Sequence, residues 1–568
     1  MNNAQVADVL ETVGKIMEVL GENPFKVRAH TNGARTIRTE STPVSELVAD
    51  KSLGDLPGIG KALEEKITEL VETGKLAYLE ELKKSVPPGI LEMLRVPSLG
   101  PKKAHTLWKE QEISTLKALE EACKEDKLSS LKGFGKKTQE KILEGITFLQ
   151  KHAGKFRLGD AWPQAMKLLQ SVGDCPDVLR AELAGSIRRS KEVVKDVDLL
   201  ASSKNPEKVM EHFLAAGEID SVIAAGKTKS SVRLRNGLQI DLRVVQDSEF
   251  ASALAYFTGS KEHNVLLRQR AQKMGMKINE YGIFKGEKKL STPDEEAFYK
   301  QLNLAYVPPE MREGTGEIEA AENETLPDLI EEKDLVGIFH SHTTWSDGTA
   351  SLEEMVNKAK SMGLKYMGLS DHSQAAFYAN GLDEVRLARQ HEEVQALNKK
   401  MKGFRIYHGM ECDILPDGSI DLNDEWLEKL DFIIGSIHSQ FNMSEKEMTD
   451  RVCKAIAHPK MTMYGHATGR LLLNREPFQI DLNRVIEAAK EHGKVIEINA
   501  NPNRLDLDSI WARKAKEAGV LLSINPDAHS TDGLGDIRYG IGTARRAWVE
   551  KKHVLNSRSG KALEKLLK

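Results

Sequence analysis

Three short runs decide the fold: Leu183-Ala184-Gly185-Ser186-Ile187-Arg188-Arg189, Lys195-Asp196-Val197-Asp198-Leu199-Leu200 and Leu238-Gln239-Ile240-Asp241-Leu242-Arg243. Asp196 and Asp198 stand two residues apart beside apolar residues, so on a β-strand both carboxylates leave the same face. Asp241 lies in another apolar run and can add a third carboxylate from a neighbouring strand. Such carboxylates repel one another unless cations lie between them, and Mg²⁺ or Mn²⁺ suits oxygen ligands.

The turn at Gly185-Ser186 offers backbone N–H groups and a hydroxyl to a phosphate, and the following arginines add positive charge. Phosphoryl transfer is the reaction that these groups would serve. An isolated Asp-x-Asp is more often a solvated strand end. The order of the three runs therefore carries more weight than any one of them.

This whole pattern resembles the nucleotidyltransferase palm of DNA polymerase beta and the other family X DNA polymerases. The segment Tyr256-Phe257-Thr258-Gly259-Ser260, followed by Asn264, Arg268 and Ile278-Asn279-Glu280-Tyr281, resembles the nucleotide-binding thumb region of that family. The resemblance implies that Asp196 and Asp198 bridge two divalent ions, Mg²⁺ or Mn²⁺, and that Asp241 helps to hold the catalytic one.

The resemblance also implies a nucleotide-binding set, which consists of Gly185, Ser186, Arg189, Tyr256, Phe257, Gly259, Asn264 and Arg268. The serine and the arginine hold the triphosphate, the aromatic pair and its glycine shape the sugar pocket, and the last two residues contact the nascent base pair. Lys261 departs from the acidic residue of the animal enzyme, so no role is assigned to it. The two aromatic residues could also be plain core residues.

Composition places the chain among multidomain globular proteins. Its 568 residues, 40% apolar and 29% charged, should form roughly three to five domains. No apolar run approaches the roughly 20 residues of a membrane span, and the N-terminus does not read as a signal peptide. The four cysteines are scattered and do not have the spacing of a disulfide framework. We expect a cytoplasmic monomer without membrane association.

The net charge of −4 does not exclude nucleic acid, because the charge is unevenly distributed. Residues 310–334 hold ten acidic residues against two basic ones, whereas residues 151–300 hold 25 basic and 20 acidic residues. The low hydrophobicity and like charges of residues 309–334 predict a solvated acidic linker.

Residues 1–150 have apolar positions at helical spacing and contain three similar glycine turns. These are Leu56-Pro57-Gly58-Ile59-Gly60-Lys61, Pro97-Ser98-Leu99-Gly100-Pro101-Lys102 and Leu131-Lys132-Gly133-Phe134-Gly135-Lys136. One copy would be read as an ordinary turn between packed helices. Three copies resemble the helix-hairpin-helix motif, in which backbone N–H groups near Gly58, Gly60, Gly100, Gly133 and Gly135 bind DNA phosphates without reading bases.

In the family, the first hairpin belongs to a lyase domain whose lysine attacks the sugar at an abasic site. Lys66 matches that lysine by its spacing from Gly58 and Gly60. A lysine that forms a Schiff base also needs a lowered pKa. The flanking segment 23–30 departs from the animal enzyme's pattern, so phosphate binding or a solvated helix face remain open for Lys66.

The C-terminal part holds 11 of the 16 histidines, and short apolar runs there repeatedly end in a potential metal ligand. Helical patterns separate these runs. Alternating strands and helices with polar groups at the strand ends predict a parallel (β/α)7-type barrel with its site at one mouth. The ligand candidates are His340, His342, Asp347, His372, Glu411, His438, His466, Asp527 and His529.

Mixed imidazole and carboxylate ligands suit Zn²⁺, Mn²⁺ or Fe²⁺. The set resembles the trinuclear site of the polymerase and histidinol phosphatase (PHP) domain, which implies three divalent metals, Mn²⁺ or Zn²⁺. By this resemblance, His340, His342, Glu411 and Asp527 hold one metal, Glu411, His438 and His466 a second, and Asp347, His372 and His529 the third. The run Val495-Ile496-Glu497-Ile498-Asn499 is expected to carry no ligand.

The chain as a whole resembles the bacterial family X DNA polymerases with a C-terminal PHP domain. The expected regions are a lyase-like domain (1–85), a fingers-like region (86–150), the palm (151–245), the thumb (246–308), the acidic linker (309–334) and the PHP domain (335–568). The resemblance implies repair synthesis from dNTPs on gapped or primer-template DNA, with a 3′-5′ exonuclease; abasic-site endonuclease activity remains open. Two alternatives for the barrel are a small-molecule phosphatase and a purely structural metal domain.

Overall fold

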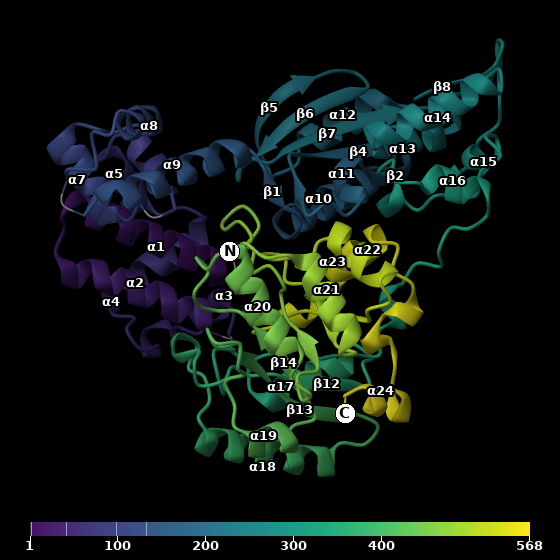
Figure 1. Cartoon of the computed structure of the whole chain (residues 1–568). Coiled ribbons are helices and arrows are strands. Elements are labelled where there is room, and N and C mark those ends of the chain that lie inside the picture. The colour runs from purple at the N-terminus through teal and green to yellow at the C-terminus, as the bar shows by residue number, and fades with distance from the viewer. Residues whose placement is uncertain (2, 41, 98, 132, 568) are drawn as a thin grey trace. The chain divides into compact units, whose positions relative to one another are not determined.

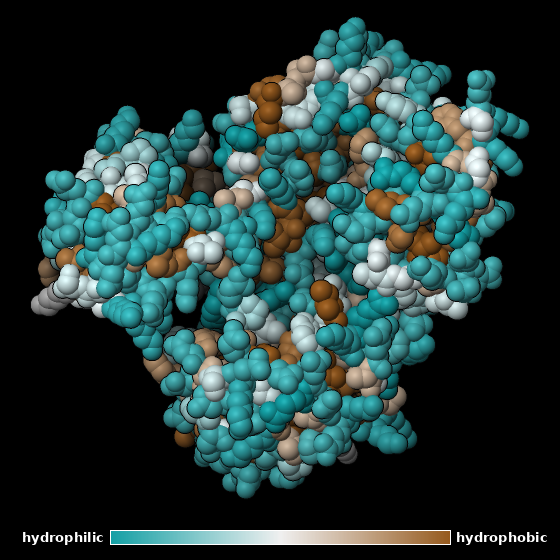
Figure 2. Space-filling model, turned by 45° about the horizontal axis from the view of Figure 1, so that its top comes forward, coloured by the Kyte–Doolittle hydropathy of each residue, from teal (hydrophilic) through white to brown (hydrophobic). Residues whose placement is uncertain are grey.

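The computed structural model describes residues 1, 3–40, 42–97, 99–131 and 133–567. The chain divides into two compact units, Met1–Ala153 and Gly154–Lys568, each with its own apolar core (Figure 1). Within the described ranges, no helix combines the length and the apolar character needed to cross a bilayer. On the face shown in Figure 2, hydrophilic residues predominate and hydrophobic ones form small separate groups.

The N-terminal unit is helical, as predicted. Its helices are α1 (Asn3–Leu20), α2 (Pro24–Thr39), α3 (Val44–Ala49), α4 (Lys61–Thr73), α5 (Ala77–Lys84), α6 (Pro88–Met93), α7 (Pro101–Gln111), α8 (Leu116–Lys124) and α9 (Gly135–His152). In α1, Val6, Leu10, Val13 and Met17 recur every three or four residues and are fully buried. That spacing places them on one helix face, which packs into the unit's core.

The palm is a five-stranded sheet in the order β2 (Val178–Ala184), β4 (Asp196–Ser203), β7 (Gln239–Val245), β6 (Lys229–Leu234) and β5 (Ile219–Ala225) (Figure 1). Strands β4 and β7 are parallel, and the other pairs are antiparallel. Helices α10 (Leu158–Gly173) and α12 (Pro206–Leu214) share one core with Val197 and Ile240. Neighbouring residues of a strand point to opposite faces of the sheet. Asp196, Asp198 and Asp241 therefore lie on the face opposite the one that α10 and α12 cover.

The thumb follows α13 (Phe250–Thr258) and contains α14 (Lys261–Lys273), β8 (Lys277–Asn279), β9 (Gly282–Lys285), β10 (Lys288–Lys289) and α15 (Glu295–Lys300). The three strands form one antiparallel sheet in the order β10-β9-β8. A short pair, β1 (Phe156–Arg157) with β3 (Val193–Val194), lies at the start of the palm.

The prediction of a solvated linker at residues 309–334 is wrong. The segment forms η3 (Pro309–Met311), α16 (Glu317–Glu322) and η4 (Glu332–Asp334), and its Met311 and Ile318 lie in the thumb core. Many of its charges have their own partners. Arg312, fully buried, lies 2.6 Å from Glu295, and the buried Glu317 lies 2.7 Å from His263. Pairing with opposite charges replaces the like-charge repulsion that favours an extended tether.

The C-terminal region forms seven parallel strands in chain order: β11 (Gly337–Ile338), β12 (Tyr366–Leu369), β13 (Arg405–Asp413), β14 (Phe432–Ser436), β15 (Met463–Tyr464), β16 (Val495–Asn499) and β17 (Leu522–Asn525). Backbone bonds from Ala528 N to His340 O and from His342 N to Ala528 O nearly close the barrel. Its helices are α17 (Leu352–Ser361), α18 (Glu384–Lys400), α19 (Asp424–Lys429), α20 (Glu445–Ile456), α21 (Leu482–Glu491), α22 (Ser509–Glu517), α23 (Ile537–Arg546) and α24 (Gly560–Leu567). The predicted (β/α)7-type barrel is confirmed.

Candidate active sites

The three palm carboxylates lie together on adjacent strands. Asp198 of β4 stands directly opposite Asp241 of β7 in the parallel register, and Asp196 precedes Asp198 by one strand repeat. Asp196 is exposed, whereas Asp198 and Asp241 are half-buried. The structure therefore brings together the three acidic residues that the sequence singled out.

The electrostatics of this cluster fit a divalent cation. Burial and the charges of Asp196 and Asp241 raise the pKa of Asp198 to about 6. Lys229 Nζ, 3.5 Å from Asp241 Oδ2, and a hydrogen bond from Gln239 to Asp241 compensate part of the negative charge. The remaining charge and the all-oxygen donor set match the ligands that Mg²⁺ or Mn²⁺ prefers.

Gly185 fits its position only because it has no side chain. It begins α11 (Gly185–Arg188) directly after β2, with φ +65°. A Cβ at this point would lie 2.2 Å from Asp198 Oδ2. The glycine thus lets the Gly-Ser turn approach the carboxylates closely.

Arg189, assigned to the triphosphate, is held by an ion network that the sequence did not reveal. Its Nε lies 3.0 Å from Glu313 Oε1, and NH1 donates to Thr258 O. Arg546 of α23 donates to the same Glu313 oxygen at 2.8 Å and to Arg189 O at 2.9 Å. Although burial raises it, the charges of Arg546, Arg189 and Lys191 lower the pKa of Glu313 to about 2.

The predicted nucleotide-binding residues of α13 and α14 lie beside this network. The rings of Tyr256 and Phe257 meet edge to face at 5.1 Å, and Asn264 Nδ2 donates to Tyr256 O at 2.7 Å. A Cβ on Gly259 would lie 3.1 Å from Arg189 NH1. Arg268, on α14, is exposed.

In the barrel, ligand candidates converge on the buried carboxylate of Glu411. His466 Nε2 and His438 Nε2 lie 2.8 and 3.3 Å from Glu411 Oε1. On the other oxygen, His340 Nε2 and His342 Nε2 lie 3.4 and 3.5 Å away. Each oxygen of Glu411 therefore faces at least two imidazoles, and Glu411 would belong to both of the metal-ligand groups in which the resemblance places it.

The remaining candidates complete the cluster. Asp527 Oδ1 lies 3.3 Å from His342 Nε2 and 3.5 Å from His340 Nε2. His342, Asp347, His372 and His529 offer ligand atoms that all lie within 4.8 Å of one another. The structure thus gathers all nine predicted ligands at the carboxyl ends of the strands.

Several imidazole nitrogens of this cluster are buried without a hydrogen-bond partner among the described residues. They are His340 Nε2, both nitrogens of His342, His372 Nδ1 and His466 Nδ1. Unpaired buried polar atoms cost about 1–3 kcal/mol each. Four of these, the His340 nitrogen, both nitrogens of His342 and His372 Nδ1, face the carboxylates of Glu411, Asp527 and Asp347, and metal ions among these groups would remove that cost.

Sequence reasoning missed the residues that orient these ligands. Glu497 Oε1 accepts a hydrogen bond from His340 Nδ1 at 2.7 Å, although its run was expected to carry no ligand. Asp413 holds His438 Nδ1 at 2.7 Å, and Asn499 Nδ2 donates to Asp527 Oδ2 at 3.0 Å. The signal available was a carboxylate inside an otherwise apolar strand, since a buried charge requires a partner.

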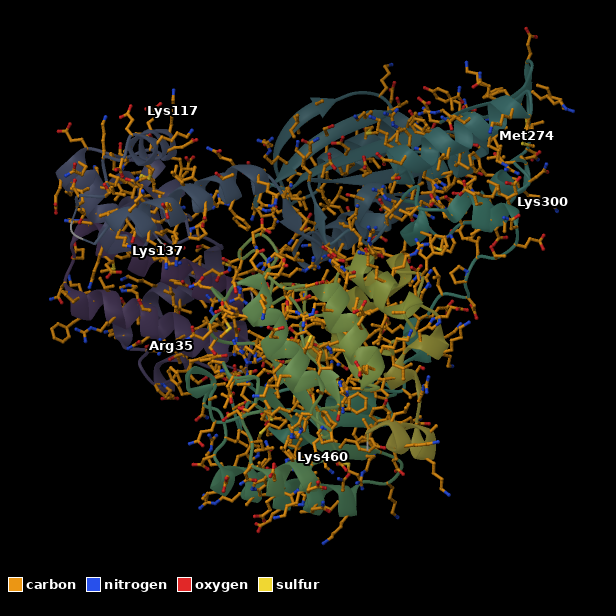
Figure 3. All side chains as sticks on the ribbon, viewed as in Figure 1. Arg35, Lys117, Lys137, Met274, Lys300 and Lys460 are labelled. Atoms are coloured by element: carbon orange, nitrogen blue, oxygen red, sulfur yellow. The ribbon has the colours of Figure 1, made fainter. Side chains whose placement is uncertain are left out.

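The three glycine turns of the N-terminal unit precede α4, α7 and α9, as predicted; Ser98 and Lys132 of the quoted runs lie outside the described residues. Apart from the neighbouring residues, a Cβ on any of the five glycines would meet no atom of the described residues within 4 Å. These backbones are therefore open to a phosphate at helix N-termini. Lys137, labelled in Figure 3, is an exposed residue of the first turn of α9.

Lys66 lies in a setting that suits a nucleophile. Its Nζ is 3.0 Å from His30 Nε2 and 4.0 Å from the centre of the Tyr78 ring. Burial and the charge of Lys26 lower the pKa of Lys66. His30 Nδ1 donates to Lys26 O at 2.9 Å, which leaves Nε2 to accept a proton.

Known proteins share these regions. A sequence model described as DNA polymerase beta thumb matches residues 253–313, and a PHP domain model matches residues 339–501. Helix-hairpin-helix models match residues 1–76 and 90–147. A Bacillus subtilis protein named DNA polymerase/3′-5′ exonuclease PolX is 39% identical over 573 residues, with 100% of both chains covered.

The chain belongs to the family X DNA polymerases that carry a PHP domain. Rat DNA polymerase lambda, also similar, is 25% identical over 348 residues, which cover 55% of this chain and 56% of the rat protein. A probable phosphatase of Thermoanaerobacter sp. is 30% identical over 238 residues, 40% of this chain and 92% of that protein. Polymerase and PHP enzymes are metal-dependent, in agreement with the two ligand clusters.

Proposed function

We propose that the chain is a gap-filling DNA polymerase that also digests DNA from the 3′ end. The observation that carries this proposal is that the palm aligns three carboxylates on adjacent strands and the barrel gathers nine metal-ligand candidates, in a chain similar throughout to a polymerase/exonuclease. The substrates are dNTPs and gapped or primer-template DNA. We expect a monomer.

In the palm, Asp196, Asp198 and Asp241 would hold two Mg²⁺ or Mn²⁺ ions, which lower the pKa of the primer 3′-hydroxyl and neutralise phosphate charge. The Gly185-Ser186 turn presents N–H groups and a hydroxyl to the triphosphate. Arg189, fixed by Glu313, adds a charge at a set position. These groups orient the reacting phosphate, and positioning provides much of the rate enhancement in phosphoryl transfer.

In the barrel, the nine clustered residues would hold three divalent metals, Mn²⁺ or Zn²⁺, which bind the scissile phosphate and supply hydroxide near neutral pH. Glu411 joins the ligand groups, and Glu497 fixes the ring orientation of His340. Glu411, Glu497 and His340 are fully buried, which excludes bulk water around them. The arrangement suits phosphodiester hydrolysis.

The test uses the purified full-length chain on a one-nucleotide gap with a 5′-labelled primer. With dNTPs and Mg²⁺ or Mn²⁺ the primer should lengthen by the gap size, and without dNTPs it should shorten from its 3′ end. Metal analysis of the same sample measures the amount of bound divalent metal, which the barrel ligands are expected to hold. Absence of both lengthening and shortening would refute the proposal.

A second candidate for the barrel is phosphatase activity on small phosphate monoesters, which the similarity to probable phosphatases favours. Histidinol phosphate and a DNA 3′ end, offered separately to the full chain, distinguish the two. Faster hydrolysis of the monoester than of DNA would favour the phosphatase.

For the N-terminal unit, the candidate activity is abasic-site lyase chemistry at Lys66, which the contact with His30 favours. Reduction with borohydride should trap a covalent complex with abasic DNA in the wild type. Lys66→Arg should lose it, while Lys61→Arg on the same helix should retain it. Equal trapping by both variants would exclude Lys66.

A further inference from the structure

Two strongly exposed aromatic side chains stand beside the barrel's ligand cluster. Phe377 and Tyr378, on η5 (Phe377–Ala379), are 86% and 61% exposed, and their rings meet edge to face at 6.0 Å. The Tyr378 ring centre lies 6.5 Å from that of His438, one of the nine ligand candidates. Large apolar surface left open next to a reaction centre is typical of a binding site.

Two arginines lie in the same neighbourhood. Arg504 Nε is 3.4 Å from Asp527 Oδ2, and its NH1 is buried with no hydrogen-bond partner in the described part of the chain. Arg475 donates to Gly469 O at 2.6 Å, and Gly469 N donates to His466 O at 2.9 Å, so Arg475 is anchored to the loop that follows the ligand candidate His466. Tyr378, next to His438, and Arg504, next to Asp527, flank the same ligand cluster.

Arg475 is held in place without a carboxylate partner among the described residues. Its guanidinium lies 4.4 Å above the Phe441 ring and donates two hydrogen bonds, at 2.9 and 2.6 Å, to Gly469 O. Its charge is therefore not cancelled by a direct ion pair. An arginine that is fixed on an aromatic ring and has no carboxylate partner suits a polyanionic ligand.

We propose that Phe377 and Tyr378 stack against the last unpaired bases of a DNA 3′ end, while Arg475 and Arg504 bind the phosphates between them. We name these four residues the mouth cluster. This inference rests on the proposed exonuclease activity and assigns the residues that hold the 3′ strand outside the ligand cluster. Stacking is indifferent to base identity, since every base has an aromatic face.

The position of Arg504 indicates that the two arginines of the mouth cluster would bind different phosphates. Because its Nε faces Asp527, Arg504 would bind the phosphate that lies closest to the ligand cluster. Arg475 would hold the preceding phosphate.

The test measures digestion of a 3′-overhang oligonucleotide by the full chain and, in parallel, hydrolysis of the small phosphodiester bis(4-nitrophenyl) phosphate. The double variant Phe377→Ala/Tyr378→Ala should raise KM for the overhang about 10–100-fold, since stacking contributes about 1–3 kcal/mol per base. The small phosphodiester should be hydrolysed at the wild-type rate. Tyr378→Phe, which keeps the ring, and Ile510→Ala, an exposed apolar control elsewhere on the barrel, should leave KM unchanged.

Arg475→Gln adds an independent measurement. Loss of one phosphate contact should reduce the slope of log KM against log salt by roughly one. If the double aromatic variant digests the overhang with wild-type KM, the mouth cluster does not bind the strand. If instead the wild type hydrolyses the small phosphodiester but no DNA, the exonuclease function itself fails. Equal loss of activity on both substrates would mean that the aromatic residues only support the fold.

Discussion

The palm and the barrel gather ligands for phosphoryl chemistry in opposite ways. The palm sets three carboxylates on one face of an open sheet, and one of them, Asp196, is exposed. The barrel buries Glu411 and His340 almost completely and braces them with a further layer that includes Glu497. The difference teaches that an open site relies on its substrate to complete the coordination, whereas a buried site must carry its own ligands and their supports.

The sharpest way to separate the two sites is to remove the palm carboxylates. Asp196→Ala/Asp198→Ala should lower primer extension by roughly 10³-fold or more, because several kcal/mol of charge stabilisation are lost. Digestion of the 3′ end should be unchanged. Asp220→Ala, an exposed acidic residue of the same sheet, serves as the control in a gap-filling assay. Retained extension in the double variant would contradict the assignment.

The reciprocal change is His342→Ala in the barrel. Digestion should fall by roughly 10³-fold and the measured metal content should drop, while extension on a gap remains. His492→Ala, an exposed histidine of the same barrel, should behave as wild type. Wild type and variants need parallel purification, since a contaminating nuclease would give digestion that no variant affects. Undiminished digestion with depleted metal would favour the structural interpretation of the barrel.

The palm's open carboxylate cluster also predicts that the metal-free protein loses folding stability as the pH rises. Burial and neighbouring carboxylates raise the pKa of Asp198 from 3.8 to about 6, so stability present below pH 3.8 is lost as pH rises through 6. Asp198→Asn should therefore raise the stability of the palm above pH 6 by about 3 kcal/mol at most. Thermal unfolding in EDTA at pH 5 and pH 8 measures this. A stabilisation equal at both pH values would indicate another cause.

The smallest expected effect comes from the layer that orients the barrel ligands. Glu497→Gln keeps the shape but removes the charge that faces His340, and should lower digestion about 10–100-fold. Added Mn²⁺ should restore part of it. Glu491→Gln, at the exposed end of α21, is the matched control. An unchanged rate at limiting metal would show that the support is dispensable.

Sequence patterns predicted what depends on local periodicity. Alternation along a strand placed Asp196 and Asp198 on one face, and strand-end positions pointed to the nine ligand candidates that the barrel gathers. The register that sets Asp198 opposite Asp241 depends on strand pairing across the intervening strands, which no local pattern encodes. The packed segment 309–334 escaped prediction for the same reason, since Glu310 pairs with Arg545, 235 residues further along the chain.

The contact between Arg546 and Arg189 has a consequence for the order of synthesis. The two residues are 357 positions apart. The positive charges of both lower the pKa of the half-buried Glu313 and so keep it ionised. At about 5–20 residues per second, a ribosome would add Arg546 roughly 20–70 s after Arg189. Once Glu313 has been added, the nascent palm has all its strands but lacks one of the cations that neutralise Glu313. The contacts that hold Arg189 are therefore completed only after the last barrel strand, β17, has been synthesised.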